Sequence, residues 1–167
     1  MNMEKRKTIG QEIAAKLKAI GITNKQVSCR SDHSSIRCSV KDLSIDLEVV
    51  KSIAMEYQKI DRCQYSGDIL SGANLFVFVN YDWQVEAATR KSDKFLQLLN
   101  TITDKLASSD IGQCADLFGA ITYKHPEGCL VLKWDGNNET NYERHHNLGN
   151  LAWSVFTKLA NGTFKEA

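Results

Sequence analysis

The N-terminal part of the chain changes from a helical spacing of apolar residues to a strand-like one. Apolar residues recur every three to four positions in its first segment: Ile9, Ile13, Leu17 and Ile20. This spacing predicts a helix that ends at Gly21, because glycine adopts the left-handed backbone of a helix end without strain. Residues 27–30 and 35–41 alternate apolar and polar side chains, which predicts two strands joined by the polar turn 31–34.

The same change from helix to strands recurs along the rest of the chain. The predicted elements are a helix over 47–57, strands over 60–65 and 75–81, a helix over 85–106, strands over 118–123 and 129–134, a loop over 135–138, and a last helix that is capped at 140 or 141 and ends near 161–162. The order is helix–strand–strand three times and then a closing helix, with no sequence repeat behind it. We therefore expect an α+β fold with one or two antiparallel sheets and helices packed on one face.

Length and composition bound the organisation of the chain. At 167 residues the chain is one domain or two small halves, and a hydrophobic fraction of 43% suffices for a packed core. We expect an α+β module at 1–83 and a helix–hairpin–helix half at 84–167 that packs on it as one unit. A net charge of +1 lacks the basic excess of proteins that bind duplex DNA mainly by neutralising phosphates.

The chain shows no targeting signal in its sequence. Residues 1–7 are charged and no apolar run is long enough to span a bilayer, which predicts a cytoplasmic protein, in a bacterial host if the family resemblance described below holds. Five scattered cysteines, an odd number, fit reduced thiols better than a disulfide framework.

The first predicted hairpin has one apolar and one polar face. Pairing Arg30 with Ser35 puts Cys29 opposite Ile36 on the apolar face. Arg30 and Arg37 then share the opposite face with serines.

Two phenylalanines of the strand 75–81 fall on the same side as these arginines. The alternation places Phe76 and Phe78 beside Arg30 and Arg37. Arginines next to aromatic rings on a sheet face offer a phosphate partner and a stacking platform, which suits a single-stranded nucleic acid. The alternative is that a helix covers this face and both rings belong to the core.

The loop 66–74 combines turn-forming and apolar residues. Asp68 and Asn74 are turn formers, and the apolar pair Ile69 and Leu70 lies between them. The pair either tucks back as a plug over the neighbouring helix or inserts as an anchor into a partner. We expect the loop to belong to a binding surface.

No set of residues in the sequence is typical of catalysis or of a metal site. Cys29, His33 and Cys38 have the chemistry of zinc ligands, but their spacing matches no recognised finger pattern. His145 and His146 are adjacent, so on the predicted helix they would point about 100° apart. We therefore expect no catalytic residues, no metal and no cofactor.

Residues 35–81 resemble one class of the large polyvalent protein-associated domains, which occur in long proteins of phages and conjugative elements. The matching features are the Ser-Ile-Arg strand at 35–37, the helix at 43–57, Arg62-Cys63, and the loop 67–74 that runs into an apolar strand ending at Tyr81. With the leading helix, the resemblance covers about the first half of the chain. Residues 87–167 have no counterpart in it.

The resemblance implies a mobile-element accessory protein, and it carries over no catalytic residue. Small free-standing proteins of such elements are often counter-defence inhibitors of the anti-CRISPR or antirestriction type. The function expected on this basis is a non-enzymatic inhibitor or adaptor that binds a host defence protein or nucleoprotein complex. Single-stranded nucleic-acid binding on the face of Arg30, Arg37, Phe76 and Phe78 is the alternative.

Overall fold

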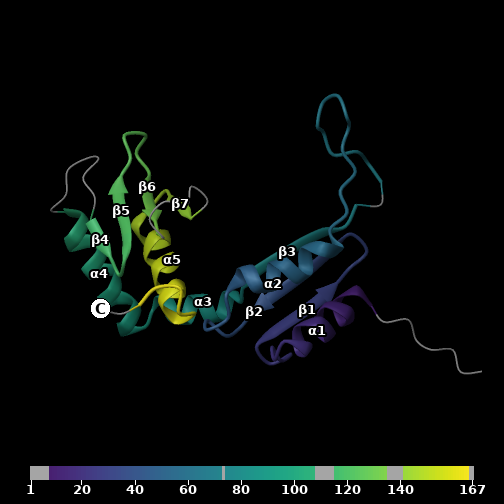
Figure 1. Cartoon of the computed structure of the whole chain (residues 1–167), viewed down its shortest axis with the longest axis horizontal. Coiled ribbons are helices and arrows are strands. Elements are labelled where there is room, and N and C mark those ends of the chain that lie inside the picture. The colour runs from purple at the N-terminus through teal and green to yellow at the C-terminus, as the bar shows by residue number, and fades with distance from the viewer. Residues whose placement is uncertain (1–7, 73, 108–114, 135–140, 166–167) are drawn as a thin grey trace, which may run out of the picture. The chain divides into compact units, whose positions relative to one another are not determined.

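The computed structural model describes residues 8–72, 74–107, 115–134 and 141–165 (Figure 1). The chain divides into two units, Met1–Val85 and Glu86–Ala167, which are treated separately below. Each unit combines helices with its own sheet, which confirms the predicted α+β class. Within the described ranges, no helix has both the length and the apolar character needed to cross a membrane.

The first unit is a three-stranded sheet with helices on one face. Its elements are α1 (Ile9–Ala19), β1 (Val27–Ser31), β2 (Ser35–Val40), α2 (Leu47–Ala54), the short 3-10 helix η1 (Met55–Tyr57) and β3 (Phe76–Tyr81). The order in the sheet is β1-β2-β3, with β1 antiparallel and β3 parallel to β2. Thr8 and Gln11 form a capping box at the start of α1, and Asp46 caps α2.

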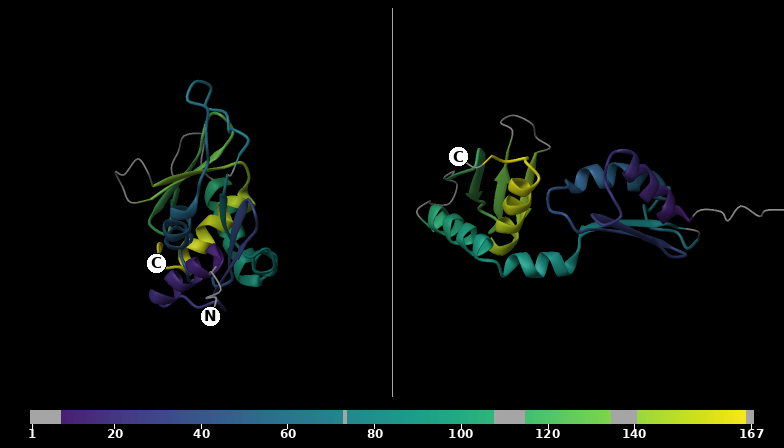
Figure 2. Two further views of the ribbon diagram at one scale, coloured as in Figure 1. Left: turned by 90° about the vertical axis from the view of Figure 1, so that its right-hand side faces the viewer. Right: turned by 90° about the horizontal axis from the view of Figure 1, so that it is seen from below.

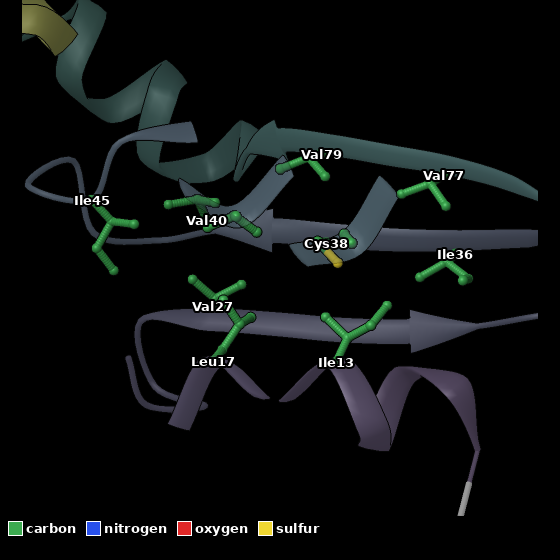
Figure 3. Packing of buried hydrophobic residues seen from close by; sticks show 11 residues of the cluster. Ile13, Leu17, Val27, Ile36, Cys38, Val40, Ile45, Val77 and Val79 are labelled. Carbon is green, nitrogen blue, oxygen red and sulfur yellow. The ribbon is translucent and has the colours of Figure 1, made fainter. Parts of the chain in front are cut away.

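Both helices pack on the same face of this sheet. Figure 3 shows Ile13 and Leu17 of α1 pointing toward the valines, isoleucine and cysteine of the strands. Val50 and Ala54 of α2 complete the same core, and all four helical side chains are buried. Helix α1 lies close to β1 at Gly10, where a Cβ atom would be only 3.2 Å from the carbonyl oxygen of Cys29.

The predicted register of the first hairpin is wrong by two residues. Cys29 lies opposite Cys38, and Arg30 lies opposite Arg37. The turn is closed by a 2.7 Å hydrogen bond from the Asp32 N–H to the carbonyl of Ser35, which moves the pairing along the strand. Because the shift is even, every side chain stays on its predicted face.

The prediction of a second hairpin from 60–65 and 75–81 is also wrong. Residues 60–65 form no strand, and β3 instead pairs in parallel with β2. The helix α2 supplies the long connection that a parallel pair needs. Segment 60–65 is mostly polar and exposed, so it has no apolar face to hold it in a sheet.

The second unit contains two main helices and a four-stranded sheet. Its elements are α3 (Trp83–Arg90, which begins at the end of the first unit), α4 (Asp93–Ala107), β4 (Ala115–Leu117), β5 (Ala120–Lys124), β6 (Leu130–Lys133), β7 (Tyr142–His145) and α5 (Leu148–Ala160). The sheet is an antiparallel meander in the order β4-β5-β6-β7. Helix α5 packs on β6 and β7, and α4 packs on α5 and β4 (Figure 2).

Three predictions in this half need correction. The helix predicted over 85–106 is two helices, because the chain turns at Ser92, whose hydroxyl caps α4 at the N–H of Phe95. Strands β4 and β7 were not predicted. The histidines expected to open the last helix lie before it: His145 belongs to β7, and Asn147 caps α5.

Candidate nucleic-acid interface

A row of two arginines and a phenylalanine crosses the first sheet on the side away from the helices. Arg30 on β1 lies directly opposite Arg37 on β2, and Arg37 lies directly opposite Phe78 on β3. The row arises because each of these residues alternates with core residues along its strand.

The row is accessible to solvent. Both arginines are exposed, and Phe78 has 47% of its surface exposed. The guanidinium carbon of Arg37 lies 5.9 Å from the centroid of the Phe78 ring, within the range of a cation–π contact. The alternative in which a helix buries both phenylalanines does not hold, since Phe78 is exposed and Phe76 is only partly buried.

The strand residues beside this row are polar and uncharged, and Asp32, which lies opposite Ser35 in the turn, places one carboxylate at the edge of the face. Ser28, Ser39 and Asn80 form a second row beside the first. We call the whole set the arginine face: Ser28, Arg30, Ser35, Arg37, Ser39, Phe76, Phe78 and Asn80. The face therefore offers two cations, an exposed ring and several hydrogen-bonding groups, with the Asp32 carboxylate at its edge.

The segment 59–75 forms a narrow hairpin that leaves the sheet before the start of β3 (Figure 1). The backbones of Lys59 and Leu75 exchange two hydrogen bonds at its base, of 3.0 and 2.6 Å. Further along, the N–H of Leu70 donates to the carbonyl of Asp61, and the N–H of Cys63 donates to Asp68. We call this segment the 59–75 hairpin.

The apolar side chains of this hairpin face solvent. Ile69 and Leu70 are each 47% exposed, and Tyr65 is fully exposed. At about half exposure the pair is not buried as a plug would be, and its role as an anchor stays a prediction.

The polar residues predicted in this loop differ in role. Asn74 is structural, since its side chain accepts a 2.7 Å hydrogen bond from the N–H of Asp61 and donates to the carbonyl of Leu70. Asp68 is exposed and its carbonyl helps to close the hairpin.

The thiols and histidines of the chain do not assemble into a metal site where they can be placed. Cys29 and Cys38 contact each other in the first unit, whereas His33 lies exposed in the turn between β1 and β2. Among the described residues, no three His, Cys, Asp or Glu side chains lie close enough together to hold a metal ion.

A partly buried polar network in the second unit has no counterpart among the sequence predictions. Glu143 on β7 accepts hydrogen bonds from Ser154 and Lys158 of α5, the latter at 2.6 Å. His145 lies 3.1 Å from the same carboxylate, and the Lys158 ammonium lies 4.4 Å from the centre of the Trp134 ring.

The electrostatics of this network favour an ionised carboxylate. Burial alone would raise the pKa of Glu143, but hydrogen bonds from His145, Lys158 and Ser154, with the charge of Lys158, outweigh it and lower the pKa to about 2. The Ser154 hydroxyl donates to the carboxylate and accepts from the ion-paired ammonium, so it links the Glu143 carboxylate to Lys158 within the network. The network therefore ties β7 to α5 and is structural.

Comparison with protein-family models, with curated proteins and with solved structures finds no match for this chain. The resemblance of residues 35–81 to the polyvalent protein-associated domains thus remains an expectation from the sequence.

Proposed function

We propose that this chain is a binding module whose first unit binds single-stranded nucleic acid across the arginine face. The observation that carries the proposal is the row of Arg30, Arg37 and exposed Phe78 on three adjacent strands. Proteins that bind single strands combine cationic groups for the backbone with aromatic rings on which bases stack. All three side chains project from strands of a packed sheet, so the platform is held in place before a ligand arrives.

The contact between Arg37 and Phe78 suggests how a strand would bind. The guanidinium already lies over the ring, so a base can stack on the outer face of the guanidinium or take its place on the ring. In either position a phosphate comes within reach of Arg30. The near-neutral net charge of +1 gives little non-specific attraction to duplex DNA, so we expect a preference for single strands.

Replacing Phe78 with alanine should weaken binding by about 1–3 kcal/mol, the usual contribution of one stacked base. The measurement is fluorescence anisotropy with labelled oligo-dT and oligo-U at low salt. Val49→Ala is the matched control, because Val49 is similarly exposed at 42% but lies on α2, on the opposite side of the sheet.

Salt dependence provides a second reading of the same experiment. Arg37→Ala should reduce the slope of log affinity against log salt by about 0.7, the value for one phosphate contact on a single strand. The proposal fails if the wild-type chain binds neither oligonucleotide, or if Val49→Ala weakens binding as much as Phe78→Ala does.

The 59–75 hairpin supports a second candidate function, docking on a partner protein. Three exposed large side chains, Tyr65, Ile69 and Leu70, project from a narrow hairpin, and buried aromatic and aliphatic anchors contribute much of the energy of protein interfaces. Together with the mobile-element resemblance, this supports a counter-defence inhibitor or adaptor that binds a host protein or nucleoprotein complex.

The double variant Ile69→Ser and Leu70→Ser should abolish capture of such a partner and change the free energy of unfolding by less than about 0.5 kcal/mol. The measurement is affinity capture from bacterial lysate, with and without nuclease, alongside thermal unfolding. Leu96→Ser is the control, because Leu96 is 44% exposed on α4.

Two outcomes contradict this candidate. Unchanged capture by the double variant would show that the hairpin is not the docking site. A loss of several kcal/mol of stability would show that the pair packs as a plug in solution.

A further inference from the structure

Two cysteines face each other across the first hairpin. Cys29 on β1 and Cys38 on β2 are direct cross-strand partners, and their Sγ atoms lie 3.2 Å apart. Cys38 is 2% exposed, whereas Cys29 is only partly buried and is the more accessible of the two residues.

The hydrogen bonds of the ladder show which kind of pair this is. The N–H of Asp32 donates to Ser35, and the N–H of Lys41 donates to Gln26, each at 2.7 Å. Because hydrogen-bonded and non-hydrogen-bonded pairs alternate along an antiparallel ladder, Cys29 and Cys38 form a non-hydrogen-bonded pair. In such pairs the Cα atoms lie about 4.5 Å apart, a separation that a disulfide bond can span.

We propose that Cys29 and Cys38 form a reversible dithiol–disulfide pair that cross-links β1 to β2 when a small-molecule disulfide is the oxidant. The two sulfur atoms need to approach by only about 1.2 Å to reach bonding distance, with both strands already in place. The inference does not depend on the proposed nucleic-acid binding.

The two thiols have different roles in the reaction. Cys38 donates a hydrogen bond to the sulfur of Cys29, which lowers the pKa of Cys29, and the same bond together with burial raises the pKa of Cys38. The Cys29 thiolate therefore attacks the small disulfide, breaks its S–S bond and releases one small thiol. Cys38 then attacks Cys29 in the mixed disulfide and gives up its proton to the second small thiol that leaves. Two protein thiols are oxidised and one small disulfide is reduced to two thiols.

The sequence allows a direct test with the full chain. The protein is equilibrated with mixtures of oxidised and reduced glutathione, quenched with acid, alkylated and digested with trypsin. Cleavage after Arg30 and Arg37 places the two thiols on separate peptides, 26–30 and 38–41, so a disulfide joins them. We expect the joined peptides to increase with the proportion of oxidised glutathione and to disappear after treatment with dithiothreitol.

Two variants give the test its controls. Cys38→Ser should stop the reaction at a glutathione adduct on Cys29, because the second attack cannot occur. Cys63→Ser should leave the yield of joined peptides unchanged. Cys63 lies on the 59–75 hairpin, where hydrogen bonds from the Ser66 side chain and from the backbone of Ser66 and Tyr65 lower its pKa to about 7, so it is a competing thiol.

Three results would overturn the inference. Both peptides could stay alkylated at glutathione ratios that modify Cys63. The wild-type chain could retain glutathione on Cys29 without forming the joined peptides. Cys29 could instead pair with a cysteine other than Cys38.

Discussion

Replacing Ile36 with alanine should lower the free energy of unfolding by about 3 kcal/mol, whereas Arg37→Ala should lower it by less than about 1 kcal/mol. The two residues are neighbours on β2 and point to opposite faces. Ile36 is fully buried in the core of the first unit, so its truncation removes apolar contacts and leaves a cavity. Arg37 is exposed, and its guanidinium contacts the Phe78 ring. Urea unfolding followed by circular dichroism measures both changes.

This comparison also tests the faces of the sheet. Ile36→Val removes one methylene group and should cost only about 1 kcal/mol. Equal destabilisation by the Ile36 and Arg37 alanine variants would mean that the arginine face is covered and cannot serve as a nucleic-acid interface.

The faces of the first sheet could be predicted from the sequence, but the pairing of its strands could not. Side chains alternate with a period of two, so Arg30, Arg37 and Phe78 were assigned to one face whatever their partners. A register shift of two residues leaves every side chain on the same face. The alternation is therefore equally compatible with the predicted pairing of Arg30 with Ser35 and with the observed pairing of Arg30 with Arg37. The sequence could not show whether β3 pairs with the adjacent segment 60–65 or with β2, which precedes helix α2. That choice depends on contacts between residues far apart along the chain.

The second unit shows a different limit of sequence analysis. Strand β7 has the sequence Tyr142-Glu143-Arg144-His145, in which apolar and polar residues do not alternate. Its inward residues, Glu143 and His145, are polar: they contact each other, and Glu143 also binds Lys158 of α5. One signal was available: Ser154 and Lys158 are four residues apart within the apolar stretch of α5. Polar residues at that spacing share a helix face and need a polar partner when buried. The loop predicted at 135–138 lies outside the described residues.

That partner, Glu143, gives the second large expected effect. Glu143→Ala should lower the free energy of unfolding by about 2 kcal/mol at pH 7, because it leaves Lys158 and Ser154 without their acceptor. This loss of stability is smaller than the loss expected on breaking a fully buried ion pair, because the Glu143 side chain is 34% exposed. Glu127→Ala is the matched control: Glu127 pairs with Arg144 at 3.2 Å but is 70% exposed, so its loss should cost less than about 0.5 kcal/mol.

The effect of Glu143→Ala should depend on pH in a defined direction. The pKa of Glu143 is about 2 in the folded chain against 4.5 for the free side chain, so between these values the unfolded chain binds more protons. The stabilisation by Glu143 is therefore complete above pH 4.5 and is lost as the pH falls toward 2. Urea unfolding at several pH values should show the difference between wild type and Glu143→Ala shrinking across this range, while the Glu127→Ala difference stays small throughout. A Glu143→Ala difference that stays constant from pH 7 to pH 2 would mean that the carboxylate is not held by Lys158, Ser154 and His145.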